Sequence, residues 1–184
     1  MTCIAGIARG GTVWIGGDSA AVNPDWHLRV GAEPKVFRSG AFVVGYTSSF
    51  RMGQLLAHAL CPPERPAGCD LMTYMVTDFV DMVRDCLKDG GFARAEHGVE
   101  SAGEFLVGIE GRLFCVETDY HVGESSDGLA ACGCGEQAAL GVLHALEGVG
   151  AAPERRIERA LEIAERLSAG VRRPFTILST GGAQ

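Results

Sequence analysis

The strongest constraint on the fold lies at the start of the chain, which reads as a tight β-hairpin followed by an acid. An apolar run over 3–8 has the length of a strand, Gly10-Gly11 is a turn signal, and a second run covers 12–15. That second strand ends in Gly16-Gly17-Asp18-Ser19. Because the two strands run antiparallel and have similar lengths, the hairpin is predicted to return Asp18 to the side of residue 2.

Residue 2 is a threonine, and its neighbours make it a candidate nucleophile. Met1 precedes a small residue, which favours removal of Met1 by an aminopeptidase. Thr2 would then carry a hydroxyl and a free α-amine with a reference pKa of about 8, which can serve as its base. Small residues also follow Met1 in chains without such chemistry, so the assignment depends on the groups expected around Thr2.

Lys35 is a third candidate, because lysine is rare in this chain. The sequence contains 14 arginines but only two lysines, and Lys35 begins the apolar segment Pro34-Lys35-Val36-Phe37. A lysine ammonium is compact and shifts its pKa readily when buried, which a guanidinium does not. The alternative is an exposed charge on an edge strand.

Thr2, Asp18 and Lys35, on successive strands, resemble the N-terminal nucleophile (Ntn) hydrolases of the proteasome β-subunit and HslV type. The resemblance is strongest over residues 1–50 and 128–146. The matching stretches are 2–6, 13–19, 35–36, 41–49 and 131–135.

The resemblance implies a role for each matching residue. Thr2 is the nucleophile, Lys35 lowers the pKa of its hydroxyl and amine, and Asp18 orients Lys35. The backbone N–H at Ser48 stabilises the oxyanion, and Cys134 stands where the family has a supporting serine.

Three positions depart from the family pattern. Ser48 replaces the usual glycine at the oxyanion donor, and Cys134 is a weaker hydrogen-bonding partner than serine. The acid of the last helix aligns with Arg166, with Glu165 one residue away, so no late acid is carried over.

The resemblance further implies a threonine-type peptidase that cleaves peptide bonds in peptide or protein substrates. Such subunits form self-compartmentalising homo-oligomers, some of them with an ATP-dependent unfoldase as partner. Two alternatives remain open. One is a catalytically silent scaffold subunit, which retained Met1 would favour, and the other is an Ntn amidase acting on a small molecule.

The remaining elements are expected to alternate in blocks of strands and helices. Ser48 or Ser49 caps a helix through 52–58, Asp70 caps a longer helix ending at Gly90-Gly91, and 91–102 is a loop. Strands are predicted over 104–110, 112–118, 129–132 and 174–180, with helices starting at Gly135 and after Pro153. This order predicts one α+β domain over 1–184 with two packed sheets between helical layers, the four-layer αββα sandwich of Ntn hydrolases.

Composition agrees with a single soluble domain, which we expect to be cytoplasmic and, because no motif requires one, to need no cofactor. Hydrophobic residues make up 47% of the chain and the net charge is −7, which argues against a nucleic-acid partner. No apolar run has the roughly 18 residues of a membrane span, and no signal peptide is evident. Seven cysteines, an odd number, argue against a disulfide framework, and Cys132-Gly133-Cys134 lacks the second ligand pair of a metal site.

Overall fold

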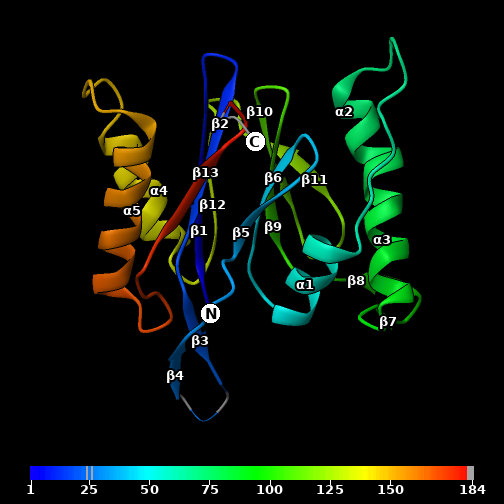
Figure 1. The fold of residues 1–184 in the computed structure, drawn as a ribbon, viewed down its shortest axis with the longest axis horizontal. Helices are drawn as coiled ribbons and strands as arrows, with labels where there is room; N and C mark the ends of the chain where they lie inside the picture. The colour runs from blue at the N-terminus through cyan, green and yellow to red at the C-terminus, as the bar shows by residue number, and fades with distance from the viewer. Residues whose placement is uncertain (24, 26, 182–184) are drawn as a thin grey trace.

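The computed structural model describes residues 1–181 except residues 24 and 26, and its first sheet is built on the predicted N-terminal hairpin (Figure 1). The hairpin pairs Ile7 with Trp14 and Arg9 with Thr12 around the turn. Two further antiparallel strands extend the sheet, one on each side. The sheet order is β12 (Leu129–Gly133), β1 (Cys3–Arg9), β2 (Thr12–Gly17) and β13 (Thr176–Ser179).

The second sheet is also antiparallel and lies against the first. It contains the predicted strands near 104–110 and 112–118, which form a hairpin that pairs Ile109 with Arg112. An additional short strand at its edge was not predicted. The order is β11 (Val122–Glu124), β10 (Arg112–Val116), β9 (Phe105–Ile109), β6 (Phe42–Tyr46) and β5 (Val36–Ser39).

Helices stand on the outer side of each sheet (Figure 1). Helices α4 (Glu136–Ala145) and α5 (Pro153–Leu167) cover the first sheet. Helix α1 (Phe50–His58) lies on the side of the second sheet, where Ser49 caps it by accepting from the Met52 N–H at 3.4 Å. The long helix predicted after Asp70 forms with a π turn in it, as α2 (Leu71–Tyr74), η1 (Met75–Phe79) and α3 (Val80–Asp89).

Three apolar clusters hold these layers together, and they decide which way each strand residue points. On β1, Cys3 packs against α4 and α5, whereas Ile4 packs between the sheets. Because side chains alternate along a strand, Thr2 shares the inter-sheet side with Ile4, and Cys3 points away from it. Burial on both sides explains the near-continuous apolar sequence of β1.

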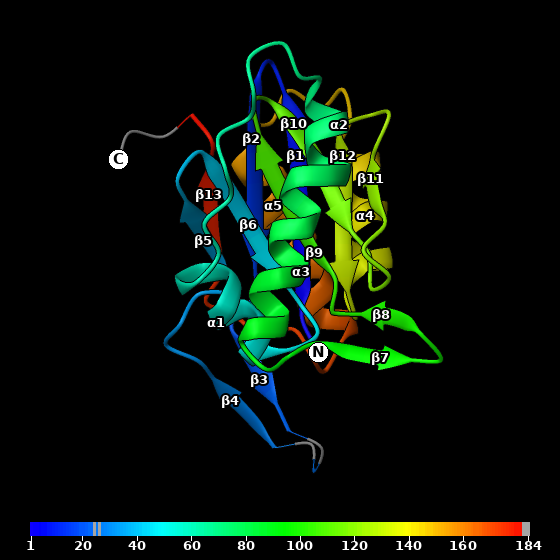
Figure 2. The same ribbon diagram turned by 90° about the vertical axis from the view of Figure 1, so that its right-hand side faces the viewer.

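Two short hairpins extend from the end of the molecule where the N-terminus lies (Figure 2). The prediction of a loop over 91–102 is wrong, because this segment contains the strands β7 (Arg94–Glu96) and β8 (Val99–Ser101). The other hairpin, β3 (Ala20–Val22) with β4 (Leu28–Val30), was not predicted. Three-residue strands with exposed side chains show no apolar alternation, which removes the signal on which strand prediction depends.

The predicted mixture of helices and packed sheets is therefore confirmed. Among the described residues, no helix combines the length and the apolar character needed to cross a membrane.

Candidate active site

Strands β1 and β2 bring Asp18 back to Thr2, as the hairpin pattern predicts. Thr2 directly precedes β1 and Asp18 directly follows β2, whose Gly17 pairs with Ile4. The Cys3 N–H donates to Asp18 Oδ1 at 3.0 Å, and the Asp18 N–H donates to Cys3 O at 3.3 Å. These two bonds continue the pairing past the end of the ladder and hold the carboxylate at the base of Thr2.

Lys35 reaches the same point from the other sheet. It directly precedes β5, and a Cβ on Gly17 would lie 2.9 Å from Val36 Cγ2, so glycine at position 17 allows this close approach. Lys35 Nζ donates to Thr2 Oγ1 at 2.8 Å and to Asp18 Oδ1 at 2.9 Å. The structure thus joins all three predicted groups by hydrogen bonds, with Lys35 between Thr2 and Asp18.

The ion pair is almost fully removed from water. Lys35 is 2% exposed and Asp18 is 1% exposed. Asp18 Oδ2 accepts from the N–H groups of Ala20 at 2.8 Å and Arg172 at 3.1 Å, so three backbone donors and one ammonium satisfy the carboxylate. Burial lowers the pKa of Lys35 below its ordinary value of 10.5, and the adjacent carboxylate of Asp18 opposes that shift.

The hydroxyl of Thr2 is also buried and has two partners. It accepts from Lys35 and donates to the carbonyl oxygen of Met1 at 2.5 Å. Thr2 is 4% exposed, whereas Met1 is 41% exposed. With Met1 in place the nitrogen of Thr2 belongs to a peptide bond. Removal of Met1 would leave an amine on the same residue and take away the acceptor of the hydroxyl proton.

Ser48 lies beside Thr2 in a turn between β6 and α1. A small groove is lined by Met1, Thr2 and residues 46–50. Ser48 has a φ of 67°, in the left-handed region where glycine is favoured. Within the described chain its N–H has no hydrogen-bond acceptor, although the N–H groups of Thr47 and Ser49 both have one. A backbone N–H without an acceptor, in a residue that lines a groove together with Thr2, is a candidate oxyanion donor.

Cys134 lies near this site, but among the described residues it makes no hydrogen bond to Thr2. Its Sγ is 3.2 Å from Ser168 Oγ, a hydroxyl that sequence reasoning missed. A Cβ on Gly170 would meet Met1 Cβ at 2.4 Å and Cys134 Sγ at 2.8 Å, so Met1 and Cys134 both border Gly170. The sequence pointed to Ser168 only weakly, as the polar residue directly after the helix predicted to follow Pro153.

Glu165, the acid next to the position where the family has its late acid, is hydrogen-bonded away from Thr2. Glu165 accepts from the Arg173 backbone N–H and from Arg173 Nε, each at 3.0 Å. Its carboxylate therefore pairs with Arg173.

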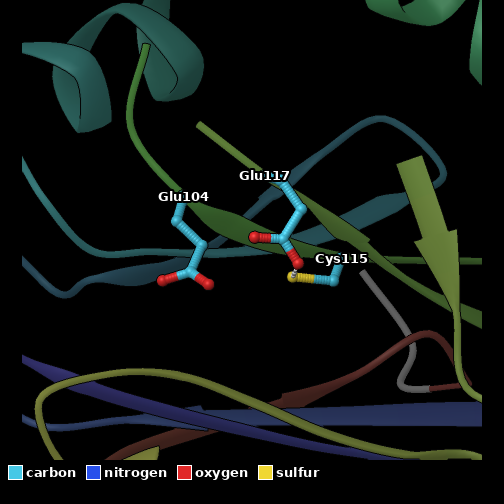
Figure 3. Close-up of side chains that lie close together, drawn as sticks. All are labelled: Glu104, Cys115 and Glu117. Atoms are coloured by element: carbon cyan, nitrogen blue, oxygen red, sulfur yellow. Dashed lines mark hydrogen bonds between the residues drawn. The ribbon is translucent and has the colours of Figure 1, made fainter. Parts of the chain in front are cut away.

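One group of side chains in the described part of the chain has metal-ligand character. Figure 3 shows Glu104, Cys115 and Glu117 pointing toward one another, with potential ligand atoms within 4.8 Å. Burial and the charge of Glu117 raise the pKa of Glu104, and burial raises that of Cys115 well above its usual range. A metal that bound there would have to displace the proton of the Cys115 thiol, which the raised pKa opposes. The expectation from the sequence that the protein needs no metal stays a prediction.

With this geometry established, comparison with known proteins identifies the fold. No protein-family model matches the chain, and comparison with curated proteins finds no match. Solved structures do match it. The BPH protein of Thiobacillus denitrificans, in a complex with epoxomicin, has a TM-score of 0.77 at 20% identity and covers 97% of both chains.

Structures of HslV and Anbu also match the chain. Eukaryotic HslV from Trypanosoma brucei matches with a TM-score of 0.68 at 16% identity, over 97% of this chain and 98% of HslV. Anbu from Pseudomonas aeruginosa, described in a helical assembly, matches with a TM-score of 0.63 at 16% identity, over 97% of this chain and 80% of Anbu. At these identities the similarity establishes the fold alone, and the chain has the proteasome-like mixed α/β fold of HslV and Anbu.

Proposed function

We propose that this protein is a threonine-type Ntn hydrolase that cleaves peptide bonds once Met1 is removed. The observation that carries the proposal is the buried chain of contacts from Thr2 Oγ1 to Lys35 Nζ, and from Lys35 Nζ to Asp18 Oδ1, at 2.8 and 2.9 Å. A buried lysine ammonium that donates to a hydroxyl can stabilise the alkoxide form of that hydroxyl, which a lysine exposed to water does only weakly.

Each group has a defined part in the reaction. Thr2 Oγ attacks the substrate carbonyl carbon, and the hydroxyl proton passes to the Thr2 α-amine. The Lys35 ammonium favours the alkoxide and the neutral amine, because its positive charge disfavours a second positive charge nearby. Asp18 holds the ammonium in place through a contact that is itself anchored by three backbone N–H groups.

The tetrahedral intermediate needs a donor for its oxyanion, and the free N–H of Ser48 is the candidate. Loss of one such donor typically costs about 2.7–4 kcal/mol of transition-state stabilisation. Collapse of the intermediate breaks the C–N bond, the protonated amine donates its proton to the leaving amine, and water then hydrolyses the acyl ester of Thr2.

The proposal includes the four-layer αββα architecture and a homo-oligomer that encloses its substrate. The helical assembly described for Anbu supports the second part, since that protein has the same fold. An ATP-dependent unfoldase partner and a cytoplasmic location are proposals that rest on the resemblance of the sequence alone.

A silent scaffold subunit is the second candidate, and two contacts favour it. Cys134 bonds to Ser168 and not to Thr2, and Glu165 is engaged by Arg173. If these side chains were needed to finish the site, the chain would bind partners without catalysing hydrolysis.

Intact-mass measurement with two reagents separates the candidates. A β-lactone requires the Thr2 hydroxyl, whereas an epoxyketone can react with both the hydroxyl and the α-amine. We expect loss of Met1 and one adduct per chain with each reagent, and no adduct in Thr2→Ala. A chain that has lost Met1 and forms neither adduct would establish the scaffold reading, and labelling that persists in Thr2→Ala would refute Thr2 as nucleophile.

A further inference from the structure

The turn that contains Ser48 is tied to the chain just before β9 by two hydrogen bonds. The Thr47 N–H donates to Glu104 O at 3.1 Å, and the Glu104 N–H donates to Ser48 Oγ at 3.1 Å. The free N–H of Ser48 belongs to the peptide group between Thr47 and Ser48. Residues on both sides of that peptide are therefore fixed to the backbone of a single residue, Glu104.

The conformation of Ser48 makes this attachment necessary. A residue with a side chain at a φ of 67° has a strained backbone, and it keeps that conformation only when its surroundings hold it. Glycine would avoid the strain, but glycine has no hydroxyl to accept from the Glu104 N–H. Serine at position 48 accepts a less favourable backbone conformation and gains a fixed orientation for its peptide.

Gly103 provides the space for this contact. A Cβ on Gly103 would lie 2.6 Å from Ser48 Cβ, and 2.9 Å from both Ser48 Oγ and Met52 Sδ. The φ of Gly103 is not in the left-handed region, so the absence of a side chain, and not backbone freedom, is what the site uses here. Any larger residue would push the Ser48 turn away.

The same turn is positioned relative to the nucleophile through Gly133. A Cβ on Gly133 would lie 2.4 Å from Thr2 O and 3.0 Å from Thr47 Oγ1. Thr2 and Thr47 thus approach one glycine from two sides. The position of the Ser48 peptide relative to Thr2 is therefore set by Gly133 on one side and by residues 103–104 on the other.

We infer that Gly103 and the Glu104 backbone are positioning residues, which act through the Ser48 side chain to aim the Ser48 N–H at the oxyanion. This inference rests on the proposed function, and it gives a role to Gly103 and to Glu104, which sequence reasoning had placed only as the first residue of a strand over 104–110. The Glu104 side chain plays no part in it, because both bonds use Glu104 backbone atoms.

The test measures how fast Thr2 is acylated by a β-lactone, using intact mass and a range of reagent concentrations. Ser48→Ala removes only the hydroxyl, and Gly103→Ala inserts a methyl group into the contact. We expect each to lower the maximal rate of adduct formation at least tenfold, with little change in the reagent concentration that gives half the maximal rate. Gly141→Ala is the matched control, because nothing lies within 4 Å of a Cβ at that position.

The outcomes separate this inference from the function beneath it. If Ser48→Ala and Gly103→Ala are folded and react at the wild-type rate while the wild-type chain is labelled, the positioning role is refuted and the hydrolase assignment stands. If Gly103→Ala does not fold, the rate of Ser48→Ala decides. A wild-type chain without Met1 that is not labelled overturns both proposals.

Discussion

We expect Asp18→Asn to destabilise the fold far more than Lys35→Met, although each removes the same ion pair. The reason is the number of donors that face each group. Asp18 accepts from Lys35 Nζ and from the N–H groups of Cys3, Ala20 and Arg172. The carboxylate therefore binds three segments of backbone in addition to the lysine.

Asparagine cannot replace this pattern. Its oxygen can serve Lys35 and Cys3, but its NH2 group then faces the N–H groups of Ala20 and Arg172, and each buried donor left without an acceptor costs about 1–3 kcal/mol. Lys35 also loses its counter-charge, and breaking a buried pair in this way typically costs about 3–5 kcal/mol. The sum is comparable with the roughly 5–15 kcal/mol by which domains are stable.

Lys35→Met leaves the three backbone donors of Asp18 in place. Methionine also fills most of the volume of a side chain that is 2% exposed, so no large cavity forms. The Asp18 carboxylate stays buried without its counter-charge, but its three backbone donors still stabilise it, so we expect a cost near the lower end of the roughly 3–5 kcal/mol typical of a broken buried pair.

Urea denaturation followed by circular dichroism measures both costs. With a slope of about 1–3 kcal/mol per molar urea, the two variants should differ in midpoint by about 1 M or more. Both should lose β-lactone labelling of Thr2. A Lys35→Met variant that is as unstable as Asp18→Asn would refute the reasoning, because it would mean that the ammonium, and not the backbone donors, accounts for the stabilising effect of Asp18.

Two further predictions concern stability. Glu104→Gln should raise the melting temperature at neutral pH, because burial and Glu117 raise the pKa of the Glu104 carboxyl and so make its ionised form unfavourable in the folded chain. The folded chain then binds more protons than the unfolded chain just above pH 4.5, so the gain should disappear as the pH falls below that value, and a gain independent of pH would contradict this account. Gly53→Ala, in α1, should cost about 1–3 kcal/mol, because a Cβ at position 53 would lie 2.1 Å from Cζ of Tyr46 on β6. Urea denaturation checks this, and a stabilised variant would show that the ring moves aside freely.

The sequence by itself determined the local parts of this site. Gly10-Gly11 between two apolar runs sets the hairpin and its register, because turn chemistry and side-chain alternation act between residues close in the chain. Thr2 and Asp18 are therefore neighbours for a reason that can be read from the first 19 residues. The helices after Asp70, Gly135 and Pro153 are predictable on the same grounds, from caps and apolar spacing.

Only the tertiary structure decided which distant groups meet at Thr2. Lys35 comes from the second sheet, and its contact with Thr2 depends on how the two sheets pack, a property of the whole core. The same packing directs Cys134 to Ser168 and places Glu104 against Ser48. These contacts span 33 to 56 residues of chain, over which neither periodicity nor turn chemistry carries information. The family resemblance alone paired Lys35 with Thr2 and Asp18, and the contacts of Ser168 and Glu104 were missed.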